Sequence, residues 1–224
     1  MLAASEVAVV PYMPILKGRA GELTALDHLP ETQVGCILPI LEVVPKTIDP
    51  IKDAYRFAER ARDRLPAGPV GIDVRYLADP ETGWRRPIRD IVDDLGCFDI
   101  RALPVVHPTD PPERLRDHGD AARDNGGRAI VRLGADRGRP DDDLTDDLLV
   151  RLDQHVRVAV EQCDLVLDMS SVLSDGQVTA AEPLARKCVS WARRQPWGSI
   201  TVAAGSMPDA VGDRESPTDD RVAG

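Results

Sequence analysis

The sequence predicts an α/β fold, specifically an incomplete, TIM-like (β/α)8 barrel with about seven parallel strands and six helices. Three observations support this prediction. Apolar, β-branched runs of strand length recur at intervals of roughly thirty residues, the length of one β/α unit. Segments with the apolar periodicity of helices lie between these runs. Most of the runs are continuously apolar rather than alternating, as expected for parallel strands that are covered on both faces.

The strand-like runs follow one another from the beginning of the sequence to near its end. Each is short, rich in Val, Ile and Leu, and bounded by polar residues, Gly or Pro, which is the usual signature of a buried strand. We expect strands at 7–16, 35–44, 69–77, 101–107, 128–134, 164–170 and 199–205.

The segments between the strands carry apolar residues three and four positions apart. Ile51, Ala54 and Ala58 begin the clearest of these stripes, which would lie against the sheet. The segment around 112–124 has the weakest pattern. The six expected helices are at 23–29, 51–65, 88–95, 112–124, 148–160 and 184–191.

Alternation of strands and helices leaves two architectures open, a doubly wound sheet and a barrel. No G-x-G-x-x-G sequence follows the first expected strand, so the dinucleotide-binding fingerprint is absent. The unit length suits a barrel, but a complete barrel needs roughly 250 residues, whereas this chain has 224. We therefore expect a single domain over 1–208 that lacks the last β/α unit, followed by a disordered polar tail at 209–224.

The composition restricts the partners and the compartment. The chain has 28 Lys and Arg against 38 Asp and Glu, a formal net charge of −10 that argues against nucleic-acid and membrane-surface partners. The N-terminal segment has no positive region, and Pro11 and Pro14 interrupt its apolar run, so we expect no secretory signal. No apolar stretch is long enough for a membrane span. These features favour a cytoplasmic protein.

The cysteines point in the same direction. None of the four forms a C-x-x-C pair, which excludes a disulfide scaffold and the common zinc spacings. Their neighbours are apolar, so we expect reduced and buried thiols. The four residues are Cys36, Cys97, Cys163 and Cys188.

The segment 12–26, YMPILKGRAGELTAL, resembles the N-terminal signature of the phage-type beta protein family. Members of this family, found in phages and bacteria, begin with Tyr-x-Pro-hydrophobic-hydrophobic-Lys, followed by Gly-Glu and Ala-Leu. LPILEV at 38–43, LVLDMSS at 165–171 and AAGSMP at 203–208 resemble later strands. The resemblance covers about residues 9–210. Members usually continue further, so it implies a C-terminally truncated member, and it implies no established reaction.

Charged or polar residues occur where the expected strands end. In a barrel the carboxyl ends of the strands surround one mouth, where active groups are found. A charge in or next to an apolar run must be paired, hydrated or used. The candidates for catalysis are Lys17, Glu42, Asp73, His107 and Asp168, and those for substrate binding are Arg75, Arg132, Gly205 and Ser206.

Anion binding is the first of three functional interpretations. Lys17, Arg75 and Arg132 would converge on a phosphate or carboxylate, for which Arg offers a planar, bidentate fork. The turn at Gly205 and Ser206 would add backbone N–H groups after the seventh strand, where barrels often bind phosphate. A small anionic ligand would then be the partner of this site.

The second functional interpretation is metal binding, and the third is acid–base chemistry. Glu42, Asp73 and Asp168 supply the hard oxygen ligands that suit Mg²⁺, which is the cofactor this interpretation would require. For acid–base chemistry, histidine is the residue type most easily tuned near neutral pH, so His107 is the candidate, with Glu42 or Asp168 as its partner. All three interpretations are compatible with one phosphoester hydrolase or lyase.

A different class of function stays open beside these. Three basic and three acidic groups would also form a neutral network that fills the barrel and performs no chemistry. The protein would then be a non-catalytic interaction or phage–host conflict and defence protein with the barrel as scaffold, or a degraded fragment of a longer member. The first and seventh strands would be exposed edges, which invite a protein partner or a second copy of the chain.

Overall fold

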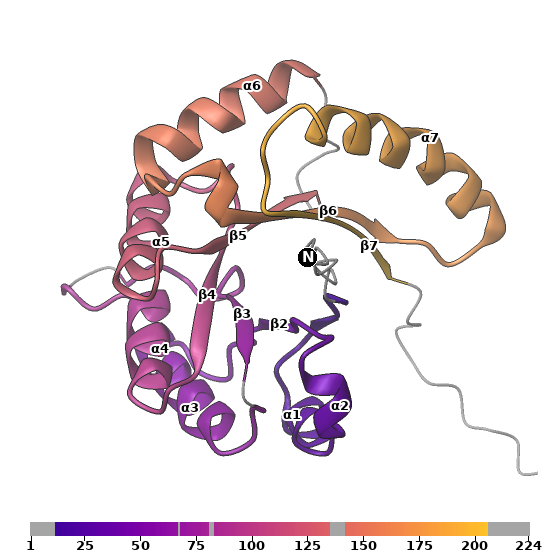
Figure 1. The fold of residues 1–224 in the computed structure, drawn as a ribbon. Helices are drawn as coiled ribbons and strands as arrows, with labels where there is room; N and C mark the ends of the chain where they lie inside the picture. Colours follow the sequence, from indigo (N-terminus) through magenta and orange to yellow (C-terminus); the bar gives the residue numbers. More distant parts are fainter. Residues whose placement is uncertain (1–11, 67, 81–82, 135–141, 206–224) are drawn as a thin grey trace, which may run out of the picture.

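Seven strands form one parallel sheet in the chain order β1 to β7, within the residues that the computed structural model describes, 12–66, 68–80, 83–134 and 142–205. The sheet curls, and the helices lie on its outer side (Figure 1). The strands are β1 Ile15–Leu16, β2 Ile40–Glu42, β3 Pro69–Asp73, β4 Arg101–Val106, β5 Ala129–Gly134, β6 Cys163–Ser171 and β7 Ser199–Gly205. This topology confirms the predicted open, barrel-like α/β fold.

Each pair of successive strands is connected through helical segments. The connection between β1 and β2 holds two helices, so the described part has seven α-helices rather than six. The helices are α1 Ala20–Asp27, α2 Glu31–Val34, α3 Pro50–Arg62, α4 Pro87–Gly96, α5 Pro112–Asp124, α6 Asp142–Arg151 and α7 Asp175–Ala192. The additional one is α2, a single turn too short to produce a periodic apolar pattern.

Both faces of the sheet are buried, which explains the continuous apolar runs. Ile40 and Ile130 lie inside the curled sheet, whereas their neighbours Leu41 and Val131 pack under the outer helices. This alternation follows from the two-residue period of a strand. The inner cluster consists of Met13, Leu38, Ile40, Leu103, Val105, Ile130 and Val166, bordered by Ile15 and Ala203.

Several element boundaries differ from the prediction. The first two strands are shorter than expected because Pro14 and Pro39 interrupt the apolar runs and cannot donate to a ladder. Helix α7 begins nine residues earlier than the predicted start at 184, since the Ser174 hydroxyl accepts a hydrogen bond from the Gln177 N–H and caps it. Residues 7–11 of the first expected strand and the expected tail at 209–224 lie outside the described residues.

The expectation of buried thiols holds for only two of the four cysteines. Cys163 and Cys188 are buried, but Cys36 and Cys97 are exposed, and none of the four forms a disulfide. Cys97 is the residue at the C-terminal end of α4, and Cys36 lies between α2 and β2. Both positions are in connections, so their apolar sequence neighbours wrongly predicted that they would be buried. In the described part of the chain, no helix has both the length and the apolar character needed to cross a membrane.

Candidate functional site

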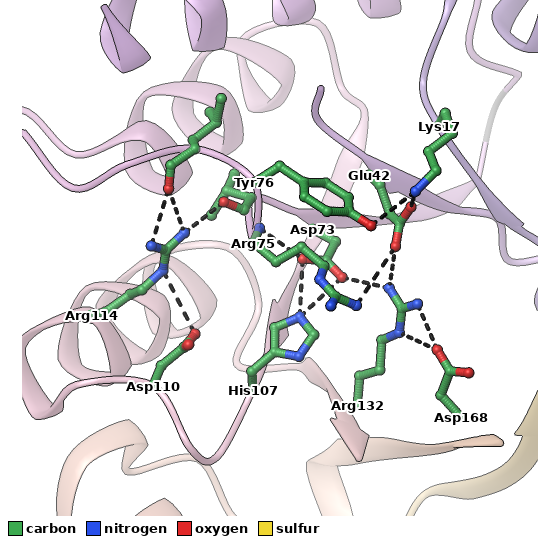
Figure 2. Close-up of polar contacts among 12 residues, drawn as sticks. Lys17, Glu42, Asp73, Arg75, Tyr76, His107, Asp110, Arg114, Arg132 and Asp168 are labelled. Atoms are coloured by element: carbon green, nitrogen blue, oxygen red, sulfur yellow. Dashed lines mark hydrogen bonds and ion pairs between the residues drawn. The ribbon is translucent and has the colours of Figure 1, made fainter. Parts of the chain in front are cut away.

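The ends of the first six strands bring their polar side chains into one layer above the inner apolar cluster. Inner positions alternate along each strand, so the residue two places after an inner apolar side chain also faces inward. On β2, Glu42 follows Ile40 in this way, and on β5, Arg132 follows Ile130. The layer consists of Lys17, Glu42, Asp73, His107, Arg132 and Asp168, with Arg75 beside it (Figure 2).

Arg132 occupies the centre of this layer, which we call the mouth network. Its Nη1 donates to Glu42 Oε1 at 2.7 Å and to Asp73 Oδ2 at 2.8 Å. Its Nη2 and Nε donate to Asp168 Oδ2 at 2.6 and 3.0 Å. Burial opposes the charge, but the three carboxylates raise the pKa of Arg132 above its usual value. A guanidinium with its five donors suits this role, because each of three acceptors receives its own N–H.

Asp73 connects Arg132 to the only histidine in the network. His107 Nε2 lies 3.0 Å from both carboxylate oxygens, and the Arg75 backbone N–H donates to Oδ1 at 2.9 Å. Burial alone would raise the pKa of Asp73, but His107 and Arg132 lower it far below its usual range. An ionised carboxylate only accepts hydrogen bonds, so Nε2 donates, and Nδ1 is the basic nitrogen of a neutral ring.

Lys17 stands at the outer side of the network. Its ammonium donates to Glu42 Oε2 at 2.5 Å and to the Tyr76 hydroxyl at 2.9 Å. Burial opposes the charge, but these two partners raise the pKa of Lys17. The Glu22 carboxylate accepts from the Lys17 and Arg19 backbone N–H groups at 2.9 Å, which anchors this loop to the start of α1.

Tyr76 is the site residue that the sequence interpretation missed. Its ring centroid lies 4.5 Å from Lys17 Nζ and 5.1 Å from the Arg75 guanidinium carbon, so it contacts both cations. The Arg75 Nη1 is in turn 4.0 Å from Glu42 Oε1. The only available signal was that Tyr76 directly follows Arg75 just beyond β3, where it would equally suit an exposed loop.

A distant arginine holds the loop that carries Arg75 and Tyr76. Arg114 on α5 donates to the carbonyl oxygens of Val74 at 2.6 Å and Leu77 at 3.1 Å. It also pairs with Asp79 at 3.2 Å (Figure 2 shows the neighbouring contact with Asp110). Because these bonds tie the loop backbone to a packed helix, the two side chains above it have a fixed platform.

Two glycines permit the close approach of backbone at this end of the sheet. Gly134 ends β5 with φ +101°, and a β-carbon there would collide with the Asp168 carbonyl oxygen. Gly18 has φ +59°, and a β-carbon would lie 2.8 Å from the ring of Phe57. Larger residues would therefore displace Asp168 or the Lys17 loop.

A cleft of about 1060 Å³ opens beside the mouth network. It lies between the two edges of the sheet, so strands β1 and β7 border it on opposite sides. The polar lining includes Lys17, Glu42, Arg75, Tyr76, Arg132, Asp168 and Ser170. Gly205 also lines it, at the end of β7, whereas Ser206 is outside the described residues. His107 does not line this cleft, and its side chain is 12% exposed.

The three carboxylates that were considered as magnesium ligands surround an arginine. Glu42, Asp73 and Asp168 direct their oxygens to Arg132, whose guanidinium takes the position that a shared cation would need. Among the described residues, no group of three or more His, Cys, Asp or Glu is arranged to hold a metal ion. The arrangement therefore favours an organic or oxyanionic ligand over a metal bound by these three groups.

The fold and the site define a parallel α/β barrel-like protein, open between its first and last described strands, with an ionic network at its C-terminal mouth. Its sequence matches the model of the family described as Beta protein over residues 12–223, and the chain belongs to this family. The family resemblance of the N-terminal segment is thereby confirmed.

A search of curated proteins finds no match to this chain. Among solved structures, it is similar to a mutant tryptophan synthase alpha-subunit from the hyperthermophile Pyrococcus furiosus, with 13% identity and a TM-score of 0.37 over 88% of this chain and 87% of that chain. A second mutant of the same subunit gives 14% identity and a TM-score of 0.39 with the same coverage. At these values nothing about the chemistry of this chain follows from the likeness.

Proposed function

We propose that this protein binds a small molecule bearing a phosphate or carboxylate at the mouth of the barrel. The observation that carries the proposal is the layering of charge in the cleft. The Lys17 side chain is 44% exposed, whereas those of its neutralising partner Glu42 and of Asp168 are 4% and 8% exposed. The cation thus faces the cleft in front of the carboxylates.

Electrostatics favours an anion in front of such a layer. The buried Glu42 carboxylate and the Tyr76 hydroxyl keep Lys17 charged and in place against the cost of burial, as its raised pKa indicates. An ammonium has three donors, and two acceptors among the described residues, Glu42 and the Tyr76 hydroxyl, take two of them. The third N–H, together with Arg75 across the Tyr76 ring, suits an oxyanion.

The proposed reaction class is phosphoester hydrolysis or elimination, with His107 as the acid–base group. Because the His107 side chain does not line the cleft, it would act on the ligand through an intervening water. Asp73 fixes the ring so that Nδ1 is basic, the arrangement in which a histidine accepts a proton. In hydrolysis, water would give a proton to His107 as its oxygen bonds to phosphorus. The leaving alkoxide would take a proton from solvent as its P–O bond breaks, and His107 would then return its proton to solvent. Asp73 would act as a positioning residue.

The scaffold function stays as the alternative because the network is balanced. The three cations Lys17, Arg75 and Arg132 face the three carboxylates of Glu42, Asp73 and Asp168, so no net charge requires a ligand. Such networks also occur where they only fix a structure.

Thermal unfolding with inorganic phosphate distinguishes the anion-binding function from the scaffold function. Phosphate should raise the melting temperature of the whole chain at constant ionic strength, because binding to the folded state alone stabilises it. Lys17→Met should lose this shift, whereas the matched control Lys52→Met, at an exposed lysine on α3, should keep it. Equal shifts in all three proteins, or none, would reject the anion site and favour the scaffold.

The proposed hydrolase activity is tested separately, by measuring phosphate release. Release of phosphate from a panel of phosphomonoesters and phosphodiesters should require His107, with a pH profile that His107→Gln abolishes. If phosphate binds but no ester is hydrolysed by the unaltered chain, the protein is a binding protein and the acid–base role is wrong.

A further inference from the structure

The cleft has a second, chemically different part. Away from the mouth network it continues between β1 and β7, where apolar or small side chains line it. Met13 and Ile15 border it on the β1 side, and Thr201 and Ala203 on the β7 side. A site for a free oxyanion alone would have no use for these apolar walls.

The described edges of the sheet approach each other at one level of this cleft. The Thr201 hydroxyl lies 3.2 Å from the Met13 sulfur, although β1 and β7 are at opposite ends of the strand order. Further along both strands the walls are Ile15 and Ala203, and Lys17 stands at the mouth. The two edges thus meet at Met13 and Thr201, and from this contact the cleft leads to the cationic end.

We propose that the ligand is an anionic amphiphile, a phosphate or carboxylate attached to an apolar chain. This inference rests on the proposed function, since it places the anionic head at Lys17 and Arg75. The apolar chain lies between β1 and β7, against Ile15 and Ala203, and ends near Met13. Head and chain each meet a surface of matching chemistry, as is usual in ligand sites.

The distance between Met13 and Lys17 along the cleft limits the length of the ligand's apolar chain. Lys17 lies four positions after Met13, which corresponds to roughly 13 Å of extended backbone. An alkyl chain of about ten carbons has this reach.

The same edge is poorly suited to an inserted strand. The Lys17 backbone N–H, which would continue the ladder of β1, donates instead to Glu22. Strand β1 itself comprises only Ile15–Leu16. An inserted strand would pair along β7 but would find only the short β1 and the Tyr12–Ile37 bridge on the other side, which would leave some of its own backbone groups without partners, whereas an alkyl chain has no such groups.

The proposal is tested by calorimetric titration of the full-length protein with a series of ligands. The series is inorganic phosphate, then methyl, butyl, octyl and dodecyl phosphate, with the alkyl phosphates kept below their micelle concentrations. Each buried methylene should tighten Kd about three- to fourfold, up to a chain of about ten carbons, after which the gain stops because the two edges meet at Met13 and Thr201. Ala203→Trp should fill the apolar part and reduce octyl phosphate to the affinity of inorganic phosphate. Ala180→Trp, at an exposed position of α7, is the matched control.

The outcomes separate this inference from the proposed function. If inorganic phosphate binds but chain length has no effect, or if Ala203→Trp does not weaken octyl phosphate, the amphiphile is rejected and the anion site remains. If inorganic phosphate does not bind at all, the proposed function fails, and the inference fails with it. A dimer by light scattering that Ala203→Trp dissociates would show that a second copy occupies this gap, which also overturns the inference.

Discussion

Two arginine–aspartate pairs join β5 and β6, one near each end of the strands. Near the C-terminal end, Arg132 pairs with Asp168 at 2.6 Å. Four residues earlier on each segment, Arg128 pairs with Asp164, also at 2.6 Å. The residue types, spacing and distances are the same, yet Arg132 is 5% exposed and Arg128 is 35% exposed.

The difference comes from what else reaches each pair. Asp164 receives one further hydrogen bond, from the Ser199 hydroxyl at 2.8 Å on the adjoining strand. Arg132 also contacts Glu42 and Asp73, which come from the other side of the curled sheet. The Arg128–Asp164 salt bridge thus stabilises only the neighbouring strands. The Arg132–Asp168 salt bridge is instead the centre of a network beside the cleft, at the end of a barrel where active sites occur.

The largest expected effect comes from the central arginine. Arg132→Met leaves the buried Glu42, Asp73 and Asp168 without their shared cation, so we expect a loss of about 3–5 kcal/mol in the free energy of unfolding. Urea denaturation at pH 7 measures it. A loss no larger than that of Arg128→Met would contradict the central role assigned to Arg132.

Asp73→Asn tests the network through pH, with a loss of about 3 kcal/mol expected at pH 7 because one partner of a buried pair is removed. The pKa of Asp73 is lower in the folded than in the unfolded chain, so its contribution is complete above about pH 4 and is lost as the pH falls further. In unfolding curves measured between pH 7 and 3, the difference between the two proteins should therefore stay constant from pH 7 down to about pH 5 and begin to shrink between about pH 4 and pH 3, with the remainder lost only at lower pH. A difference that does not change with pH would disprove the assignment.

The smallest effect is expected at the other end of the strands. Arg128→Met removes a partly exposed pair, and we expect a loss of at most about 1 kcal/mol, reduced further by salt. The shift in melting temperature caused by phosphate should stay unchanged, because Arg128 is remote from the cleft. If Arg128→Met abolished this shift, the anion would bind at the N-terminal ends of the strands, and the proposed site at the C-terminal mouth would be wrong.

Much of the mouth network was predictable from local sequence. Continuous apolar runs marked the strands, and a charged residue at the end of a run, such as Glu42 or Asp168, marked the rim. Asp164 and Arg128 carry the same local signal, and only the direction of the strands assigns them to the opposite end. Tyr76 carried no signal, since its contacts with Lys17 and Arg75 depend on a loop held by Arg114.

Sequence alone determined the order of the strands and of every helix except the one-turn α2, the parallel sheet and the residues at the strand ends, because strand and helix periods are local properties of the chain. Tertiary structure decided that Arg132 sits among the three carboxylates and that β1 and β7 border a cleft. Those features depend on how strongly the sheet curls, which follows from packing inside it, and no local pattern records that curvature.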